Sequence, residues 1–208
     1  MKSTELKTQS ISLVIGCFLM IVTMVLHPVG GNFEHLVSIF TVGVVSHAIA
    51  ILSIPFVTYG FWGLTEKIST PIAKLSFVFM AFGLMAVMLA GTVNGIVLMN
   101  FVQSYADASQ ETIASLKPIF RLLFDLNHAF DFIFIGAVYI STLLWSISII
   151  KTKILPISLG WFGTILSLAG IVASTAGFVF VDVTGFRIFI FSWVAWVIWC
   201  GIAMIKSK

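Results

Sequence analysis

The chain has 208 residues, of which 60% are hydrophobic and only 9% are charged, whereas a soluble domain averages roughly 25% charged residues. This composition leaves no room for a soluble catalytic domain. The apolar segments are also too long for a water-soluble core, because six of them reach the length of about 20 residues that a membrane span needs. The net charge of +3 comes from basic residues scattered at loop ends, which does not indicate nucleic-acid binding. The sequence therefore predicts one all-α domain over residues 1–208, an integral membrane bundle of six transmembrane helices in a lipid bilayer.

The first three spans are expected at residues 10–27, 40–64 and 75–102. A cluster of helix-breaking residues, Pro28 to Asn32, ends the first of them. The second contains Pro55, which a transmembrane helix tolerates where neighbouring groups satisfy the carbonyl that loses its partner.

The last three spans are expected at residues 118–150, 156–181 and 187–205. Pro118 suits the first turn of a helix and is therefore expected to open the fourth span. In the polar loop before it, Asp107–Leu116 is predicted to form a short interfacial helix.

Basic residues are distributed unevenly between the two sides of this six-span pattern. The smaller group, with three members, comprises Lys117, Arg121 and Arg187. The other eight share the opposite side: Lys2, Lys7, Lys67, Lys74, Lys151, Lys153, Lys206 and Lys208. Because cytoplasmic loops carry an excess of Lys and Arg, both termini are predicted to be cytoplasmic.

Aromatic and small residues indicate how the helices are embedded. Trp62, Trp145 and Trp161 fall near predicted cytoplasmic span ends, as in an interfacial aromatic belt. Small residues at helical spacing allow close helix packing in lipid, which is the role expected for Gly91 and Gly95. The same role is expected for Gly160, Gly163 and Gly170, and core or lipid contact is expected for Trp193, Trp196 and Trp199.

The fourth span carries the densest set of polar groups. At 100° per residue, Arg121, Asp125 and His128 fall within about 60° of one another, and Asp131 lies about 60° beyond. Arg121 and Asp125 have the spacing of an ion pair on one helix. Either Asp125 or Asp131 is a candidate to orient the His128 ring, as carboxylates do for metal-bound histidines. Ionisable groups inside a membrane usually face the bundle interior or a cavity.

Other polar groups are predicted at the same depth, in the half of the bilayer away from the termini. They are His27, His47, Asn94, Asp182 and Arg187. We therefore expect an outward-facing polar pocket with His27, His47, His128 and Asp131 as candidate ligands. Arg121 and Asp125 would support it as an ion pair, and Asn94 as a hydrogen-bonding wall.

Three interpretations of this pocket stay open. Three imidazoles and a carboxylate suit a transition metal, or His47 and His128 suit the two axial positions of a b-type haem with Arg121 and Arg187 at its propionates. Alternatively, the polar groups form a structural network that locks the helices together. In a third interpretation the chain is a small proton-coupled transporter, which would benefit from forming a homo-oligomer or a larger membrane complex.

Four short segments carry a family resemblance: Leu26–Pro28, Ser46–Ala48, Leu126–Phe130 and Leu159–Gly163. They resemble segments of small six-span bacterial inner-membrane proteins that share a domain of unknown function. The resemblance implies six spans and a location in the bacterial inner (cytoplasmic) membrane. It implies no activity, cofactor or site residue.

Overall fold

The computed structural model describes residues 3–207, so Lys2 and Lys208, which entered the orientation argument, lie outside the described residues. Within this range the regular structure is helical, and six helical segments are long and apolar enough to cross a membrane. The predicted all-α membrane bundle of six spans is therefore confirmed.

Five of the spans are single helices: α1 (Ser3–Leu26), α3 (Phe40–Ile68), α6 (Gln110–Thr152), α7 (Ile157–Thr175) and α8 (Val183–Lys206). The third span is composite, with α4 (Pro71–Gly91), the π-helix η1 (Thr92–Leu98) and α5 (Met99–Ser104) following one another. A short helix, α2 (Phe33–Ser38), lies between the first two spans and was not predicted.

The start of α6 differs from the prediction. Asp107–Leu116 does not form a separate interfacial helix, because α6 begins at Gln110 and runs without interruption through Pro118. Ser109 starts the helix by accepting a hydrogen bond from the Thr112 backbone N–H at 3.2 Å. Pro118 therefore lies inside the helix rather than at its start. Its missing N–H costs one backbone hydrogen bond, which the rest of this 43-residue helix outweighs.

The fifth span is shorter than predicted, because α7 ends at Thr175 rather than near residue 181. Gly177 follows in the left-handed region, with φ of 90°, and turns the chain. The sixth span begins at Val183, where the Asp182 carboxylate accepts a hydrogen bond from the Gly185 N–H at 2.6 Å. This helix cap satisfies a backbone donor that would otherwise lack a partner.

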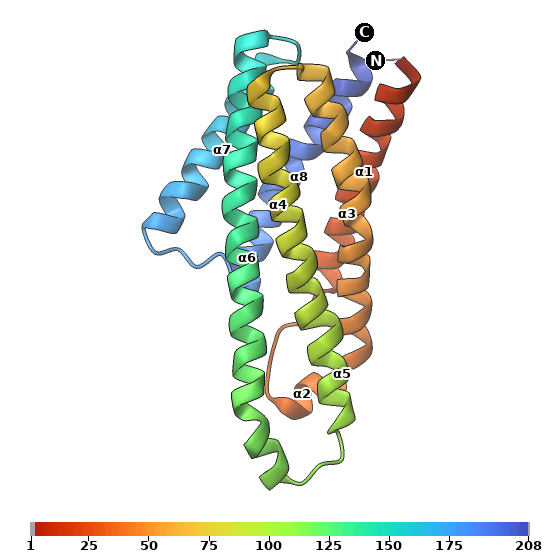
Figure 1. Cartoon of the computed structure of the whole chain (residues 1–208), viewed down its shortest axis with the longest axis vertical. Helices are drawn as coiled ribbons and strands as arrows, with labels where there is room; N and C mark the ends of the chain where they lie inside the picture. Colours follow the sequence, from red (N-terminus) through yellow and green to blue (C-terminus); the bar gives the residue numbers. More distant parts are fainter. Residues whose placement is uncertain (1–2, 208) are drawn as a thin grey trace.

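Successive spans run in opposite directions, which brings both chain ends to one end of the bundle and α2 and α5 to the other (Figure 1). The most extensive helix contacts are those of α1 with α3 and of α4 with α6. The longest helix, α6, spans roughly 65 Å at about 1.5 Å per residue. It is therefore about twice as long as the hydrocarbon thickness of about 30 Å.

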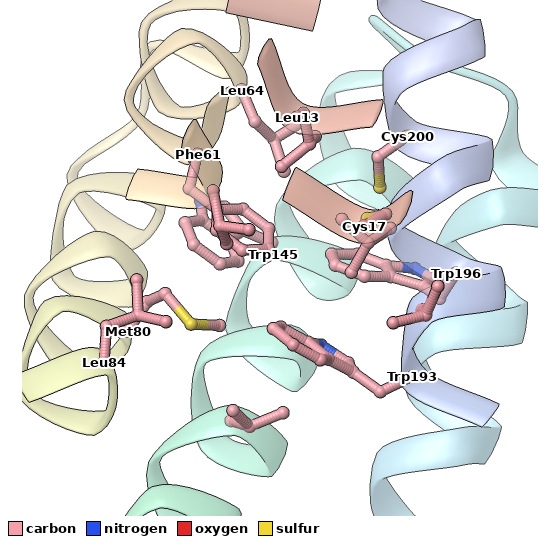
Figure 2. Packing of buried hydrophobic residues seen from close by; sticks show 14 of the residues in the cluster. Leu13, Cys17, Phe61, Leu64, Met80, Leu84, Trp145, Trp193, Trp196 and Cys200 are labelled. Atoms are coloured by element: carbon pink, nitrogen blue, oxygen red, sulfur yellow. The ribbon is translucent and has the colours of Figure 1, made fainter. Parts of the chain in front are cut away.

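An aromatic core that includes Phe61, Trp145, Trp193 and Trp196 lies between α3, α6 and α8 (Figure 2). Trp145 is fully buried, stacks on Phe61 with ring centroids 4.7 Å apart, and donates a hydrogen bond to the Thr65 hydroxyl at 3.2 Å. The predicted belt position of Trp145 is therefore wrong, since its indole N–H has a partner inside the protein. Trp62 and Trp161, in contrast, are 45% and 55% exposed.

Glycine 163 shows how closely α7 approaches its neighbours. A Cβ atom at this position would lie 2.1 Å from the Ser146 hydroxyl oxygen and 2.4 Å from the Trp196 indole nitrogen. Only a residue without a side chain allows that approach, as predicted for the small residues of this span.

Candidate functional site

A cavity of about 330 Å³ lies in the half of the bundle away from the termini. It is formed by the end of α1, by α3, by α4 and η1, by α6 and by the start of α8, while α2 and the loop before it contribute to its outer side. Seven of the nine predicted site residues line it, namely His27, His47, Asn94, His128, Asp131, Asp182 and Arg187. The four candidate ligands are thus brought to one cavity by three parts of the chain: the end of the first span, α3 and α6.

His27 and His47 form an imidazole pair inside this cavity. Their ring centroids are 4.8 Å apart and the ring planes are tilted by 56°. The Nδ1 atom of His27 lies 2.9 Å from the Pro28 carbonyl oxygen, and that of His47 lies 2.7 Å from the Gly43 carbonyl oxygen. A carbonyl only accepts hydrogen bonds, so each neutral ring carries its proton on Nδ1. The lone pair of each Nε2 is left available to a ligand.

The π-helix η1 places its residues against this pair. A Cβ atom at Gly95 would lie only 2.0 Å from the Cβ of His47, so α3 and η1 pack with a glycine directly beneath the histidine. Asn94, the preceding residue, lines the cavity. π-Helical turns inside α-helices are frequently found at functional sites, and this one lies at the predicted position of the polar wall.

Asp131 is the buried carboxyl group of the cavity, with 8% of its surface exposed. Its carboxylate accepts a hydrogen bond from the Asn127 side-chain amide at 2.8 Å. The prediction that a carboxylate orients His128 is therefore not met by Asp131, whose partner lies one turn away on its own helix. His128 itself lines the cavity at an exposed position.

The predicted ion pair between Arg121 and Asp125 is present, with Nε 3.0 Å from Oδ2. Its side chains are 81% and 56% exposed, and neither lines the cavity. The pair is therefore not part of the cavity wall, and its supporting role stays a prediction. Both residues lie on α6 before Asp131, on a face that neighbouring helices do not cover. A single sequence does not show which part of a polar helix face is covered by other helices.

Arg187 and Asp182 contribute mainly through the backbone. The Arg187 guanidinium donates a hydrogen bond to the His27 carbonyl oxygen at 2.8 Å and so joins α8 to the end of α1. Asp182 caps α8, as described above. Both residues line the cavity, and their interactions fix the wall in which His27 lies.

Thr23 is a cavity residue that sequence reasoning missed. Its side chain is 3% exposed, and its hydroxyl has no hydrogen-bond partner among residues 3–207. Thr23 precedes His27 by four residues and therefore lies on the same face of α1. Helical spacing from His27 was the available signal, but threonine is too common in membrane spans for that spacing to be specific.

His27 lies directly after the first span, and its surroundings disfavour its cationic form. Burial lowers the pKa of His27 to about 4, and the neighbouring His47 and Arg187 contribute in the same direction. The ring is therefore neutral at pH 7, which agrees with the tautomer inferred from its hydrogen bond.

We expect a pH-dependent stability from this residue. Because the pKa is lower in the folded than in the unfolded state, the unfolded state binds more protons below pH 6.5. The contribution of His27 to the free energy of unfolding should be constant above that pH and fall by roughly 1–3 kcal/mol as the pH is lowered from 6.5 to about 4. Unfolding by SDS in mild detergent measures this, and H27Q should reduce the decrease while H35Q should not. Equal decreases in the wild type and H27Q would contradict this assignment.

The six apolar helices define a multi-pass membrane protein, and a cavity lined by apolar residues and several polar side chains lies between them. No protein-family model, curated protein or solved structure matches the chain. Across the described residues, no group of three or more His, Cys, Asp and Glu side chains is close enough to hold a metal ion. The lining residues therefore include a pair of histidines and, apart from it, the Asp131 carboxyl group, which is hydrogen-bonded to the Asn127 side-chain amide. They do not form a complete set of metal ligands.

Proposed function

We propose that this membrane protein binds a small polar ligand in the cavity, using His27 and His47 as hydrogen-bond acceptors. The observation that carries the proposal is the pair of rings 4.8 Å apart, each with Nδ1 engaged by a backbone carbonyl. With Nδ1 engaged in this way, the Nε2 atom of each ring can accept a hydrogen bond from a ligand. Asp131 and Asn94 supply further polar contacts in the same chamber.

A transition metal or a b-type haem is the second candidate. A neutral histidine whose Nδ1–H is held by a carbonyl is also the usual form of a metal ligand. A closed metal site needs about four donors, whereas the close pair supplies two. For this reason a hydrogen-bonded ligand is supported better than a metal. For haem, the predicted axial pair was His47 and His128, whereas the ring that lies beside His47 is that of His27.

A purely structural network is supported less well. In such a network the buried polar groups would satisfy one another. Here the buried Thr23 hydroxyl has no hydrogen-bond partner in the part of the chain that the structure describes, and the Nδ1 atoms of His27 and His47 bond to backbone carbonyls rather than to other polar side chains of the cavity. The transporter interpretation would add movement of the ligand across the membrane.

The location of the cavity follows from the charge distribution. The excess of basic residues at the end of the bundle with the termini supports a cytoplasmic location for that end and an outward-facing cavity. The inner membrane of a bacterium remains the proposed compartment, and a homo-oligomer or a membrane complex the proposed assembly.

Histidine NMR in lipid nanodiscs tests the proposed function, since the chain has only four histidines. Ethylene glycol, Zn²⁺ and haemin serve as separate probes of the three ligand types. We expect ethylene glycol to shift the His27 and His47 ring signals in a saturable manner and to leave His35, outside the cavity, unchanged. H47A should abolish the shift of His27, and H35A should preserve it.

Two results would overturn this proposal. One is that none of the three probes shifts the His27 and His47 signals. The other is that they shift these signals and that of His35 alike, which would indicate a general solvent effect. A saturable response to Zn²⁺ or haemin alone would replace the polar ligand by a metal or a haem.

A further inference from the structure

A second, smaller cavity of about 50 Å³ continues the polar chamber toward the middle of the bundle. The two cavities share five lining residues: Thr23, Met24, Ala50, Val87 and Phe186. Apart from Thr23 and Ser53, every residue that lines the inner cavity is apolar. The Ser53 hydroxyl donates a hydrogen bond to the Ala50 carbonyl at 2.6 Å, so it offers no free donor to a ligand.

The polar side chains of the two chambers are concentrated in the outer one, although much of its wall is also apolar. The outer chamber contains the histidine pair, Asn94 and Asp131, whereas the inner chamber is walled by side chains such as Ile54, Leu84 and Ile190. The Thr23 hydroxyl, 3% exposed and without a partner among residues 3–207, lies at their junction.

From this arrangement we infer that the ligand is an amphiphile with a hydroxyl-bearing head in the outer chamber and an apolar group in the inner one. This inference rests on the proposed function and adds the ligand class to it. The hydroxyl follows from the acceptors: two Nε2 lone pairs and the Asp131 carboxyl group favour a donor, and the Thr23 hydroxyl adds a further partner. A ligand without a donor would displace water from these acceptors without replacing its hydrogen bonds, which costs binding free energy.

The outer chamber also reaches the lipid-facing side of α6. His128 lines it and is exposed, and Phe132, one turn further on the same face, is 71% exposed. This arrangement would allow a molecule dissolved in the bilayer to enter the outer chamber from the lipid, beside Phe132. Moving the apolar group of a ligand from lipid into the inner chamber gains little free energy, because both surroundings are apolar. The interactions of the head group should therefore determine the affinity.

Photolabelling in nanodiscs tests the ligand class. The probe is a primary alkanol with a diazirine at the far end of its chain, and the control is the alkane that carries the same diazirine without the hydroxyl. We expect the alkanol to label the inner chamber, at peptides containing Ile54, Leu84 or Ile190, at least about tenfold more than the alkane. Unlabelled alkanol should compete, and unlabelled alkane should not.

Two matched substitutions on α3 locate the binding. A50F fills the junction of the chambers and should reduce labelling of the inner chamber at least about tenfold, whereas A48F, at an exposed position of the same helix, should leave it unchanged. Competition by a diacylglycerol would identify a hydroxylated lipid as the source of the ligand, and competition by a ubiquinol would identify a reduced isoprenoid quinone.

The outcomes separate this inference from the proposed function. Equal labelling by the alkanol and the alkane, or labelling that A50F leaves unchanged, would overturn the amphiphile. If ethylene glycol still shifts the His27 and His47 signals in that case, the polar chamber keeps its proposed function with a wholly polar ligand. If it does not, both proposals fail.

Discussion

Replacement of Gly95 by alanine should lower the free energy of unfolding by about 1–3 kcal/mol and also disturb ligand binding. The added methyl carbon would lie 2.0 Å from the His47 Cβ and 2.1 Å from its Cγ, so η1 and α3 would have to separate. His47 would move away from His27, and the acceptor pair would lose its geometry. SDS-induced unfolding in mild detergent and the histidine NMR spectrum report the two effects.

Gly136 provides the matched control for this substitution. It lies within α6, and no atom lies within 4 Å of the position where its Cβ would be. G136A should therefore leave the His27 and His47 signals unchanged and alter stability by at most about 1 kcal/mol, in the stabilising direction, because alanine favours a helix over glycine. Equal effects of G95A and G136A would show that the close approach at His47 does not determine the site.

Replacement of Trp145 by alanine should cost about 3–5 kcal/mol of unfolding free energy. The side chain is fully buried and lies 4.7 Å from the Phe61 ring, centroid to centroid, and 6.5 Å from that of Trp196. Its removal leaves a cavity among α3, α6 and α8 and also leaves the buried Thr65 hydroxyl without its indole donor. The melting temperature in mild detergent should fall accordingly.

Trp161 is the control for this core substitution. It is 55% exposed, so W161A should change the unfolding free energy by no more than about 0.5 kcal/mol. Because Trp145 lines neither cavity, W145A should destabilise the protein without removing the response of His27 to a ligand in the fraction that remains folded. Comparable losses in W145A and W161A would contradict the buried position of Trp145.

The sequence predicted the spans well because their length and apolarity reflect one dominant constraint, the bilayer. It failed where local chemistry decided the boundary. Ser109 and not Pro118 sets the start of α6, and Gly177 ends the fifth span early. Trp145 was placed at the interface because its position along the helix suggested a belt, whereas burial depends on which helices cover that face.

The candidate site was predictable in its depth but not in its contacts. His27, His47 and Asp131 were placed in one half of the membrane from their positions along the spans, and they do line one cavity. The proximity of His27 to His47 depends on the order of helices around the bundle, which one sequence does not encode in its spacing. Arg121 and Asp125 share a helix and nearly a face with His128, yet they are exposed and do not line the cavity.

Native mass spectrometry of the protein released from its own membrane tests the central claim, a ligand in the outer chamber, most directly. We expect one adduct of discrete mass on the wild type and on H35A, and loss of that adduct on H47A. Fragmentation of the adduct would then identify it as a hydroxyl-bearing amphiphile, a metal or a haem. A wild-type protein without an adduct, or an adduct retained equally by H47A, would contradict the claim.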